Sequence, residues 1–228
     1  MSGRRPGPLL RNGLTLFFGG VFILALAGQA FTGVAYYNEV QVSAGLDPIT
    51  LGQYVMSSAF AVDVTENWQS EYLQFTLYIL ATVWLVQRGS PESKALDKAG
   101  RESDEEQKVA EYSTKDSPPW ARVRGWRLWV YSHSLTLVMG TIFLLSWLAQ
   151  SISGAAAYSE NQLRGFQDPV SWGEYVVRPE FWGRTLQNWQ SELLAVASMV
   201  ILSVYLRERG SPESKPVGSP HAATAVEG

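Results

Sequence analysis

The chain has 228 residues, of which 46% are hydrophobic and 17% charged, and its formal net charge is −3. This modest charge gives no indication of a nucleic-acid partner. The sequence contains no cysteine, which excludes disulfides, iron–sulfur clusters, thiolate zinc sites and cysteine nucleophiles.

Four apolar windows predict helices long enough to cross a bilayer. The first, residues 14–37, has no formally charged side chain and corresponds to about 36 Å of α-helix. The others cover about residues 68–86, 135–158 and 189–206, and the second and fourth each contain one glutamate. Aromatic residues near the window ends fit the interfacial belts of membrane proteins. The alternative, a soluble helical core, would need a large protein around these windows.

Lysine and arginine are unevenly distributed between the windows. Residues 38–66 contain none, whereas residues 88–130 contain nine. The positive-inside rule therefore predicts that the central segment and both termini lie in the cytoplasm. The N-terminal arginines followed by an apolar run also resemble a signal peptide. We expect this helix to be retained, because the equivalent window at 135–158 has the same design in mid-chain.

The chain contains an internal repeat. A shift of 121 residues aligns residues 12–94 with residues 133–215 without a gap, and 33 of the 83 aligned pairs are identical. This predicts a tandem duplication of a unit made of helix, external loop and helix. Each unit crosses the membrane twice, so the two should be parallel repeats related by a pseudo-two-fold axis along the membrane normal. The predicted fold class is an all-α membrane protein with four transmembrane helices and short external helices.

The repeat also divides the chain into segments. These are a cytoplasmic N-terminus (1–13), repeat 1 (14–94), a charged cytoplasmic linker (95–132), repeat 2 (133–215) and a disordered C-terminal tail (216–228). In each loop an Asp-Pro pair, at 47–48 and 168–169, predicts a short helix capped by the aspartate. The sequence RGSPESK, at 88–94 and 209–215, predicts where the second helix of each unit ends.

Two sets of shared residues are candidates for a role inside the membrane. The first is a glycine seam that would allow close helix packing: Gly19, Gly33, Gly140 and Gly154. The second includes parts of the repeated sequence NWQSE, which opens the second apolar window of each unit. Helix periodicity and depth predict a polar intramembrane cluster of Gln29, Asn67, Ser70 and Glu71 in repeat 1 and Gln150, Asn188, Ser191 and Glu192 in repeat 2.

A carboxylate in hydrocarbon is costly and is usually paired, hydrogen-bonded or hydrated. Three interpretations of how the two glutamates meet this need remain open. Glu71 and its counterpart Glu192 could bind loop amides and clamp the external loop onto the bundle. They could instead face one vestibule as a proton or cation site, where two nearby carboxylates raise one pKa. They could also anchor a partner or a lipid at the interface.

Catalytic groups are scarce. His133 and His221 are the only histidines, and His133 lies at the opposite depth of the membrane from Glu192, which argues against a shared metal site. The sequence contains no phosphate-binding glycine loop and no nucleophile motif. We therefore expect a protein that is not an enzyme, with no catalytic residue, no metal and no cofactor.

The repeated motifs also resemble those of a known group of proteins. They are NGLT or HSLT at the start of each unit, GQxxxG or AQxxxG in the first helix, DPxxxGxY in the loop, and NWQSE followed by RGSPESK. Together they are similar to an uncharacterised family of small bacterial integral membrane proteins, over about residues 12–94 and 133–215. The resemblance implies a membrane location. Because that family has no assigned activity, it implies no mechanism.

Two functions follow as hypotheses. The first is an accessory or scaffold protein of a bacterial cytoplasmic (inner) membrane, because no charged residue lies near the predicted midplane. The alternative is a permease or channel for a small solute, proton or cation that uses Glu71 and Glu192. The expected partners are the lipid bilayer and either a homo-oligomer or a larger membrane assembly, without nucleic acid. Whether the carboxylates face one cavity or bind the external loops distinguishes the two functions.

Overall fold

The computed structural model describes residues 7–226, and within them it contains helices and no strand. This confirms an all-α fold. The helices are α1 (Pro8–Arg11), α2 (Gly13–Ser43), α3 (Leu51–Val55), α4 (Ser58–Trp84), α5 (Trp126–Ser132), α6 (Ser134–Arg164), α7 (Trp172–Tyr175) and α8 (Pro179–Tyr205), with 3-10 turns at Ala110–Tyr112 and Pro119–Arg122.

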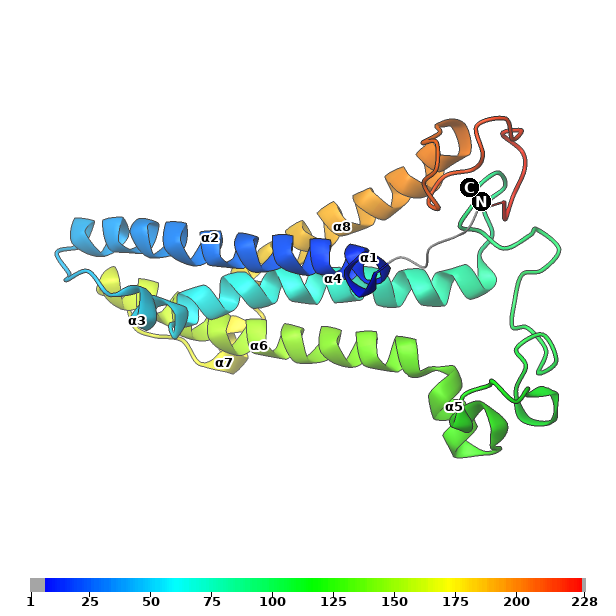
Figure 1. Cartoon of the computed structure of the whole chain (residues 1–228). Coiled ribbons are helices and arrows are strands. Elements are labelled where there is room, and N and C mark those ends of the chain that lie inside the picture. Colours follow the sequence, from blue (N-terminus) through cyan, green and yellow to red (C-terminus); the bar gives the residue numbers. More distant parts are fainter. Residues whose placement is uncertain (1–6, 227–228) are drawn as a thin grey trace.

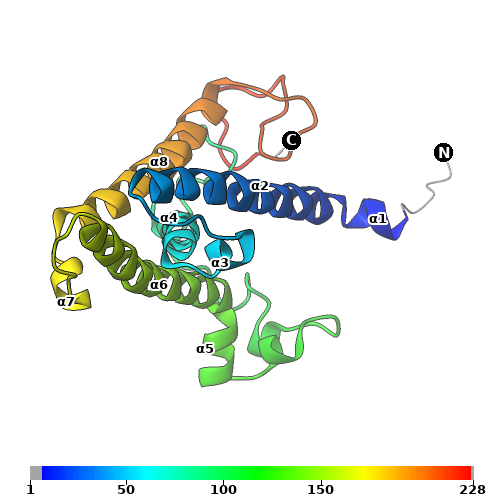
Figure 2. The same cartoon turned by 90° about the vertical axis from the view of Figure 1, so that its left-hand side faces the viewer.

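The long helices form an elongated bundle. Helices α4 and α6 run side by side, while α2 and α8 diverge from them (Figures 1 and 2). The most extensive helix interface joins α4 to α6, and the next joins α4 to α8. The short helices α3 and α7 lie at one end of the bundle, and the central segment lies at the other (Figure 1). The first helix of the chain is thus only loosely attached, and the interior is formed by α4, α6 and α8.

The two halves of the chain have matching elements. Helix α6 begins and ends 121 residues after α2, and α8 begins and ends 121 residues after α4. Side-chain geometry matches as well. The ring centroids of Phe22 and Trp68 are 6.4 Å apart, and those of the aligned Phe143 and Trp189 are 6.5 Å apart. The aligned sequences therefore adopt the same local structure.

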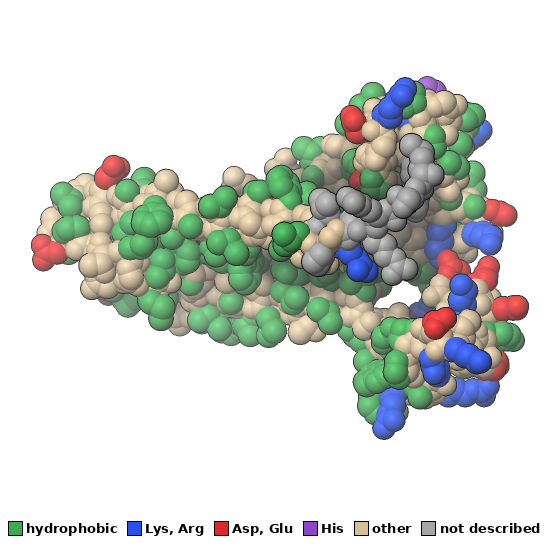
Figure 3. Space-filling view, in the orientation of Figure 1, with side chains coloured by type: hydrophobic (Ala, Val, Ile, Leu, Met, Phe, Trp, Pro, Cys, Tyr) green, Lys and Arg blue, Asp and Glu red, His purple; other side chains and the backbone are tan. Residues whose placement is uncertain are grey.

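Two helices, α2 and α6, are long and apolar enough to cross a membrane. Only 6% of the most apolar stretch of α2 and 17% of that of α6 are buried, unlike the core helix of a soluble protein. Helices α4 and α8 do not meet the same criterion among the described residues, because polar and charged side chains in their first halves, NWQSE among them, lower their mean hydropathy. On the face shown in Figure 3, apolar side chains are nevertheless spread along the bundle, while most charged side chains lie at one end.

The predicted helix ends need two corrections. Thr50 and Ser171, rather than the aspartates, cap α3 and α7, and each forms a capping box with the residue three positions on. A capping box satisfies one more backbone N–H than a lone aspartate does. Helix α4 ends at Trp84, before RGSPESK, because the backbone becomes extended at Leu85. The motif instead folds back, and Ser93 accepts a hydrogen bond of 2.8 Å from the N–H of Gln87.

The described part of the C-terminal tail contains turns and no helix. It folds back in turns onto the first RGSPESK motif, where the N–H of Gly89 donates to the hydroxyl of Thr224 at 2.9 Å. The N–H of Ala225 donates to the carbonyl of Ser90 at 3.2 Å. Lys215, 1% exposed, holds the segment by donating to four backbone carbonyls. Composition alone misses this, because the contacts to Gly89 and Ser90 join the segment to the other unit.

Candidate functional site

A cavity of about 660 Å³ lies mainly between α2 and α4 of the first unit, with Met139 of α6 completing its wall. Three residues of the predicted polar cluster line it together, namely Gln29, Asn67 and Glu71. Its other walls are mainly apolar and aromatic: Phe22, Ala25, Leu26, Val64, Trp68, Tyr72, Phe75 and Met139. The cavity therefore combines one carboxylate, two amides and four aromatic rings.

The surroundings of Glu71 bear on the interpretation that it clamps the external loop. Its side chain is exposed at the cavity, and within residues 7–226 it has no hydrogen bond to a loop amide, tyrosine or tryptophan. The neighbouring polar residues instead bond to their own helix. Asn67 donates to the carbonyl of Asp63 at 2.7 Å, and Ser70, 1% exposed, donates to that of Asn67 at 2.9 Å. Glu71 is thus left available to a ligand.

The same space in the second unit is filled. Trp147 takes the place of Leu26, and its ring lies 5.8 Å from those of both Phe143 and Trp189. Gln150, the counterpart of Gln29, is 0% exposed and donates to Thr185 at 3.4 Å. Valine stands at the position aligned with Thr185 in the first unit, so Gln29 has no equivalent partner. Two substitutions between otherwise similar units thus leave the first one hollow.

The remaining cluster residues of the second unit lie outside the cavity. Asn188 donates to the carbonyl of Arg184 at 2.9 Å, and Ser191 donates to that of Asn188 at 2.8 Å. Glu192 is half-buried, and its carboxylate interacts electrostatically with that of Glu71. Glu192 does not line the cavity that holds Glu71. The two carboxylates are therefore near each other but do not share this cavity.

The glycines of the predicted seam have different surroundings. A Cβ atom on Gly154 would lie 2.6 Å from the Tyr175 hydroxyl, and one on Gly33 would lie even closer to that of Tyr54. Each of these two glycines thus leaves room for a tyrosine on the short external helix of the same unit, rather than for a neighbouring long helix. Gly140 has ordinary contact with Thr76 on α4, whereas Gly19 has open space around it.

We predict that Gly154→Ala will lower the stability of the protein. Tyr175 is 1% exposed and packs in the aromatic cluster of the second unit, so it cannot withdraw without disturbing its neighbours. Such overpacking costs about 1–3 kcal/mol. Thermal unfolding in detergent measures the effect, with Gly20→Ala as a control because a Cβ there meets nothing within 4 Å. Equal Tm values for the two variants would contradict the close contact.

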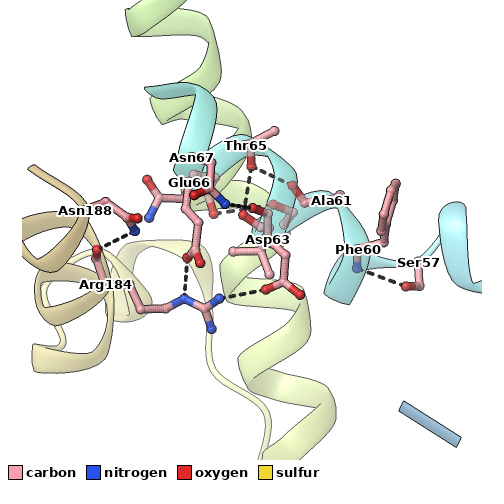
Figure 4. A network of polar contacts seen from close by, with 12 residues as sticks. Ser57, Phe60, Ala61, Asp63, Thr65, Glu66, Asn67, Arg184 and Asn188 are labelled. Carbon is pink, nitrogen blue, oxygen red and sulfur yellow. Dashed lines mark hydrogen bonds and ion pairs between the residues drawn. The ribbon is translucent and has the colours of Figure 1, made fainter. Parts of the chain in front are cut away.

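An ion-pair network that the sequence analysis missed joins α4 to α8 before their apolar parts begin (Figure 4). Arg184 binds Asp63 at 2.8 Å and Glu66 at 2.6 Å. Burial raises the pKa of Asp63 and that of Glu66 despite this cation, while the hydrogen bond that Arg184 donates to Glu66 raises the pKa of Arg184. Residues 63 and 184 are aligned in the repeat, so their opposite charges were the available signal for this pair.

The two NWQSE sequences also contact each other. The indole N–H of Trp189 donates to the side-chain oxygen of Gln69 at 2.7 Å. Gln69 is 0% exposed, and its amide nitrogen has no partner among the described residues. The motif therefore has a packing role between α4 and α8, in addition to the cavity-lining role of Asn67 and Glu71.

The comparisons with known proteins give a family and no activity. A family model described as a domain of unknown function (DUF6766) matches residues 7–226, and the chain belongs to this family. No curated protein and no solved structure matches the chain. Among residues 7–226 there is also no group of three or more histidine, cysteine, aspartate and glutamate side chains placed to hold a metal ion. Function must therefore be argued from the cavity and its lining.

Proposed function

We propose that this member of the family is a bacterial inner-membrane protein with four membrane-spanning helices and both termini in the cytoplasm. Large apolar side chains are exposed on all four long helices, among them Phe18 on α2, Leu80 on α4, Leu144 on α6 and Ile201 on α8. Exposed apolar surface of this extent needs an apolar environment. The charges of the first halves of α4 and α8 would lie at the external interface, where a charged side chain costs less than at the centre.

We further propose that the first unit binds a small organic cation in the cavity at Glu71. The observation that carries this proposal is the combination of one exposed carboxylate with the rings of Phe22, Trp68, Tyr72 and Phe75 around one space of about 660 Å³. An ammonium group is attracted both to a carboxylate and to the faces of aromatic rings. The amides of Gln29 and Asn67 can hydrogen-bond a substituent of the ligand.

The side chains that fill the second unit favour a ligand-binding protein over a channel. With Trp147 in place of Leu26, packed against Phe143 and Trp189, a side chain occupies the matching position of the second unit and obstructs a symmetric pathway. The proposal is therefore a ligand-binding membrane protein rather than a channel through the bundle. The second candidate function, an accessory component of a larger assembly, is favoured by the polar and apolar faces that α8 leaves uncovered.

Glu71→Gln should weaken ammonium binding about 10- to 100-fold, because a hydrogen bond to a charged group contributes about 1.5–3 kcal/mol. The measurement is calorimetric titration of the protein in nanodiscs with alkylammonium ions from methylammonium to choline, against dimethylbutanol as the uncharged isostere of choline. Glu192→Gln is the matched control, since its carboxylate lies outside the cavity. Because that carboxylate interacts electrostatically with Glu71, this variant should lose some affinity, but less than Glu71→Gln.

The outcomes separate the possible ligands. Nanodiscs with and without phosphatidylethanolamine distinguish a lipid headgroup from a free solute, because a headgroup occupying the site would compete with the added cation. Absence of binding by any ammonium ion in both lipid compositions would overturn the cation-binding proposal. Equal affinity of the uncharged isostere, or an equal loss in Glu192→Gln, would also overturn it.

A further inference from the structure

Identical residues of the two NWQSE copies have unlike surroundings. Gln69 and Ser70 on α4 are 0% and 1% exposed, whereas the aligned Gln190 and Ser191 on α8 are exposed. Both pairs lie in the predicted membrane-spanning part of their helices. A glutamine facing lipid has no partner in the hydrocarbon, and such exposure is costly. The second copy of the motif therefore lacks a cover that the first one has.

The chain itself shows what covers the first copy. Helix α6 packs along α4 in the most extensive interface of the bundle, where Gly140 allows contact with Thr76. From α8, Trp189 donates its indole N–H to Gln69 at 2.7 Å. The cover of α4 thus consists of the first helix of the following unit and the tryptophan on its second helix.

The residues aligned with Gly140, Thr76 and Trp189 do not make the corresponding contacts within residues 7–226. Gly19 on α2 corresponds to Gly140 and has nothing within 4 Å of an added Cβ. Ala197 on α8 corresponds to Thr76 and is exposed. Trp68 corresponds to Trp189, is 40% exposed, and makes no hydrogen bond through its indole N–H within residues 7–226. The indole N–H of Trp68 and the side-chain amide of Gln190 thus lie on different units, and within residues 7–226 neither has a hydrogen-bond partner.

We propose that a second copy of this chain covers α8, with its α2 placed as α6 is placed on α4 and its Trp68 donating to Gln190. Since each copy has one such α8 and one such α2, two reciprocal contacts close a two-fold dimer of four units. The interface continues the α4–α6 and α4–α8 packing of the chain by one further unit.

Charge complementarity supports the same register. In the chain, Arg184 of one unit binds the acidic residue at the aligned position, Asp63, of the preceding unit. In the proposed dimer, Asp63 of the second copy would lie beside Arg184 of the first copy. Acidic and basic side chains would then alternate around the assembly. Had both aligned positions been acidic, the contact between copies would have placed like charges together.

The occupant could in principle be the α2 of the same chain, and cysteine cross-linking decides between the two. The sequence has no native cysteine, so introduced pairs report unambiguously. One tagged copy carries Gly19→Cys and a differently tagged copy carries Ala197→Cys, and both are co-expressed and treated in membranes with a short bifunctional thiol reagent. The positive control is the aligned pair Thr76→Cys with Gly140→Cys in one chain, which should cross-link internally.

We expect a covalent heterodimer carrying both tags. If the two single variants give no dimer while the double variant Gly19→Cys with Ala197→Cys cross-links within one chain, α2 closes on its own α8 and the proposal is overturned. Absence of cross-links in both, with the positive control intact, overturns it equally.

A second measurement tests the polar contact without cross-links. Gln190→Leu should raise the dimer dissociation constant in detergent about tenfold, because it removes the acceptor of the Trp68 N–H. Ile201→Ala is the matched control, since the aligned Leu80 on α4 is itself exposed and the position should face lipid in both units. Analytical ultracentrifugation measures the constant. A monomeric wild type, or the same shift in both variants, would contradict the proposed interface.

Discussion

Replacing Lys215 by methionine should release the C-terminal segment from the first RGSPESK motif. The Lys215 ammonium donates to the carbonyls of Gly89 at 2.5 Å, His221 at 2.8 Å, Ala223 at 3.2 Å and Pro220 at 3.4 Å, and the side chain is 1% exposed. Each buried carbonyl left without a donor costs about 1–3 kcal/mol. Since the segment can restore these hydrogen bonds with water by detaching, detachment is the expected response.

Hydrogen exchange of residues 216–226 measures this release, and we expect the slow amides of the wild type to exchange rapidly in the variant. The matched control is Lys94→Met at the aligned position, where the ammonium binds the Gly100 carbonyl at 3.0 Å and the side chain remains 28% exposed. This control should leave residues 216–226 protected. Unchanged exchange in Lys215→Met would mean that the other contacts of the segment suffice to hold it.

The helical architecture was predictable because it depends on local and additive properties. A long uncharged window such as 14–37 requires its backbone hydrogen bonds to be satisfied internally, which predicts a helix. The internal repeat then gave a second copy of each helix to compare. In the structure, α6 and α8 begin and end 121 residues after α2 and α4. Helix ends were less predictable, since the cap at Thr50 depends on a capping box with Gln53 rather than on the more obvious Asp47-Pro48.

The candidate site was predictable only in part. Helical spacing and depth predicted that Gln29, Asn67 and Glu71 are neighbours, and in the structure all three line one cavity. The sequence did not predict that only the first unit is hollow. Whether a unit is hollow depends on which side chain occupies the space between its helices. The effect of having tryptophan at 147 where the first unit has Leu26 can be judged only when the packing around both positions is known.

The contacts between the units were the least predictable part. Asp63 and Arg184 are far apart in the chain, and neither lies in a conspicuous motif. Their pairing depends on how α4 crosses α8, a tertiary relation that neither hydropathy nor helical periodicity contains. The alignment of the repeat nevertheless held a clue. An acidic residue in one copy and a basic one in the other, at the same position, is the pattern expected where equivalent positions of two units meet.

Leu26→Trp should fill the cavity of the first unit and abolish ammonium binding there. The aligned Trp147 shows that the unit accommodates this side chain, with Phe143 and Trp189 around it where Phe22 and Trp68 stand in the first unit. Filling the space leaves no room for a ligand, so affinity should fall by about 100-fold or more, beyond the loss expected for Glu71→Gln. Cavity filling should at the same time raise stability by about 0.5–2 kcal/mol.

The combination of tighter folding and lost binding is what distinguishes this result from damage to the protein. Calorimetric titration measures the affinity and thermal unfolding measures the stability. Leu24→Trp is the control, because Leu24 is 74% exposed and does not line the cavity, so its affinity should remain that of the wild type. If Leu26→Trp folded more stably and still bound the cation, the ligand would have to lie elsewhere, and the proposed site would be wrong.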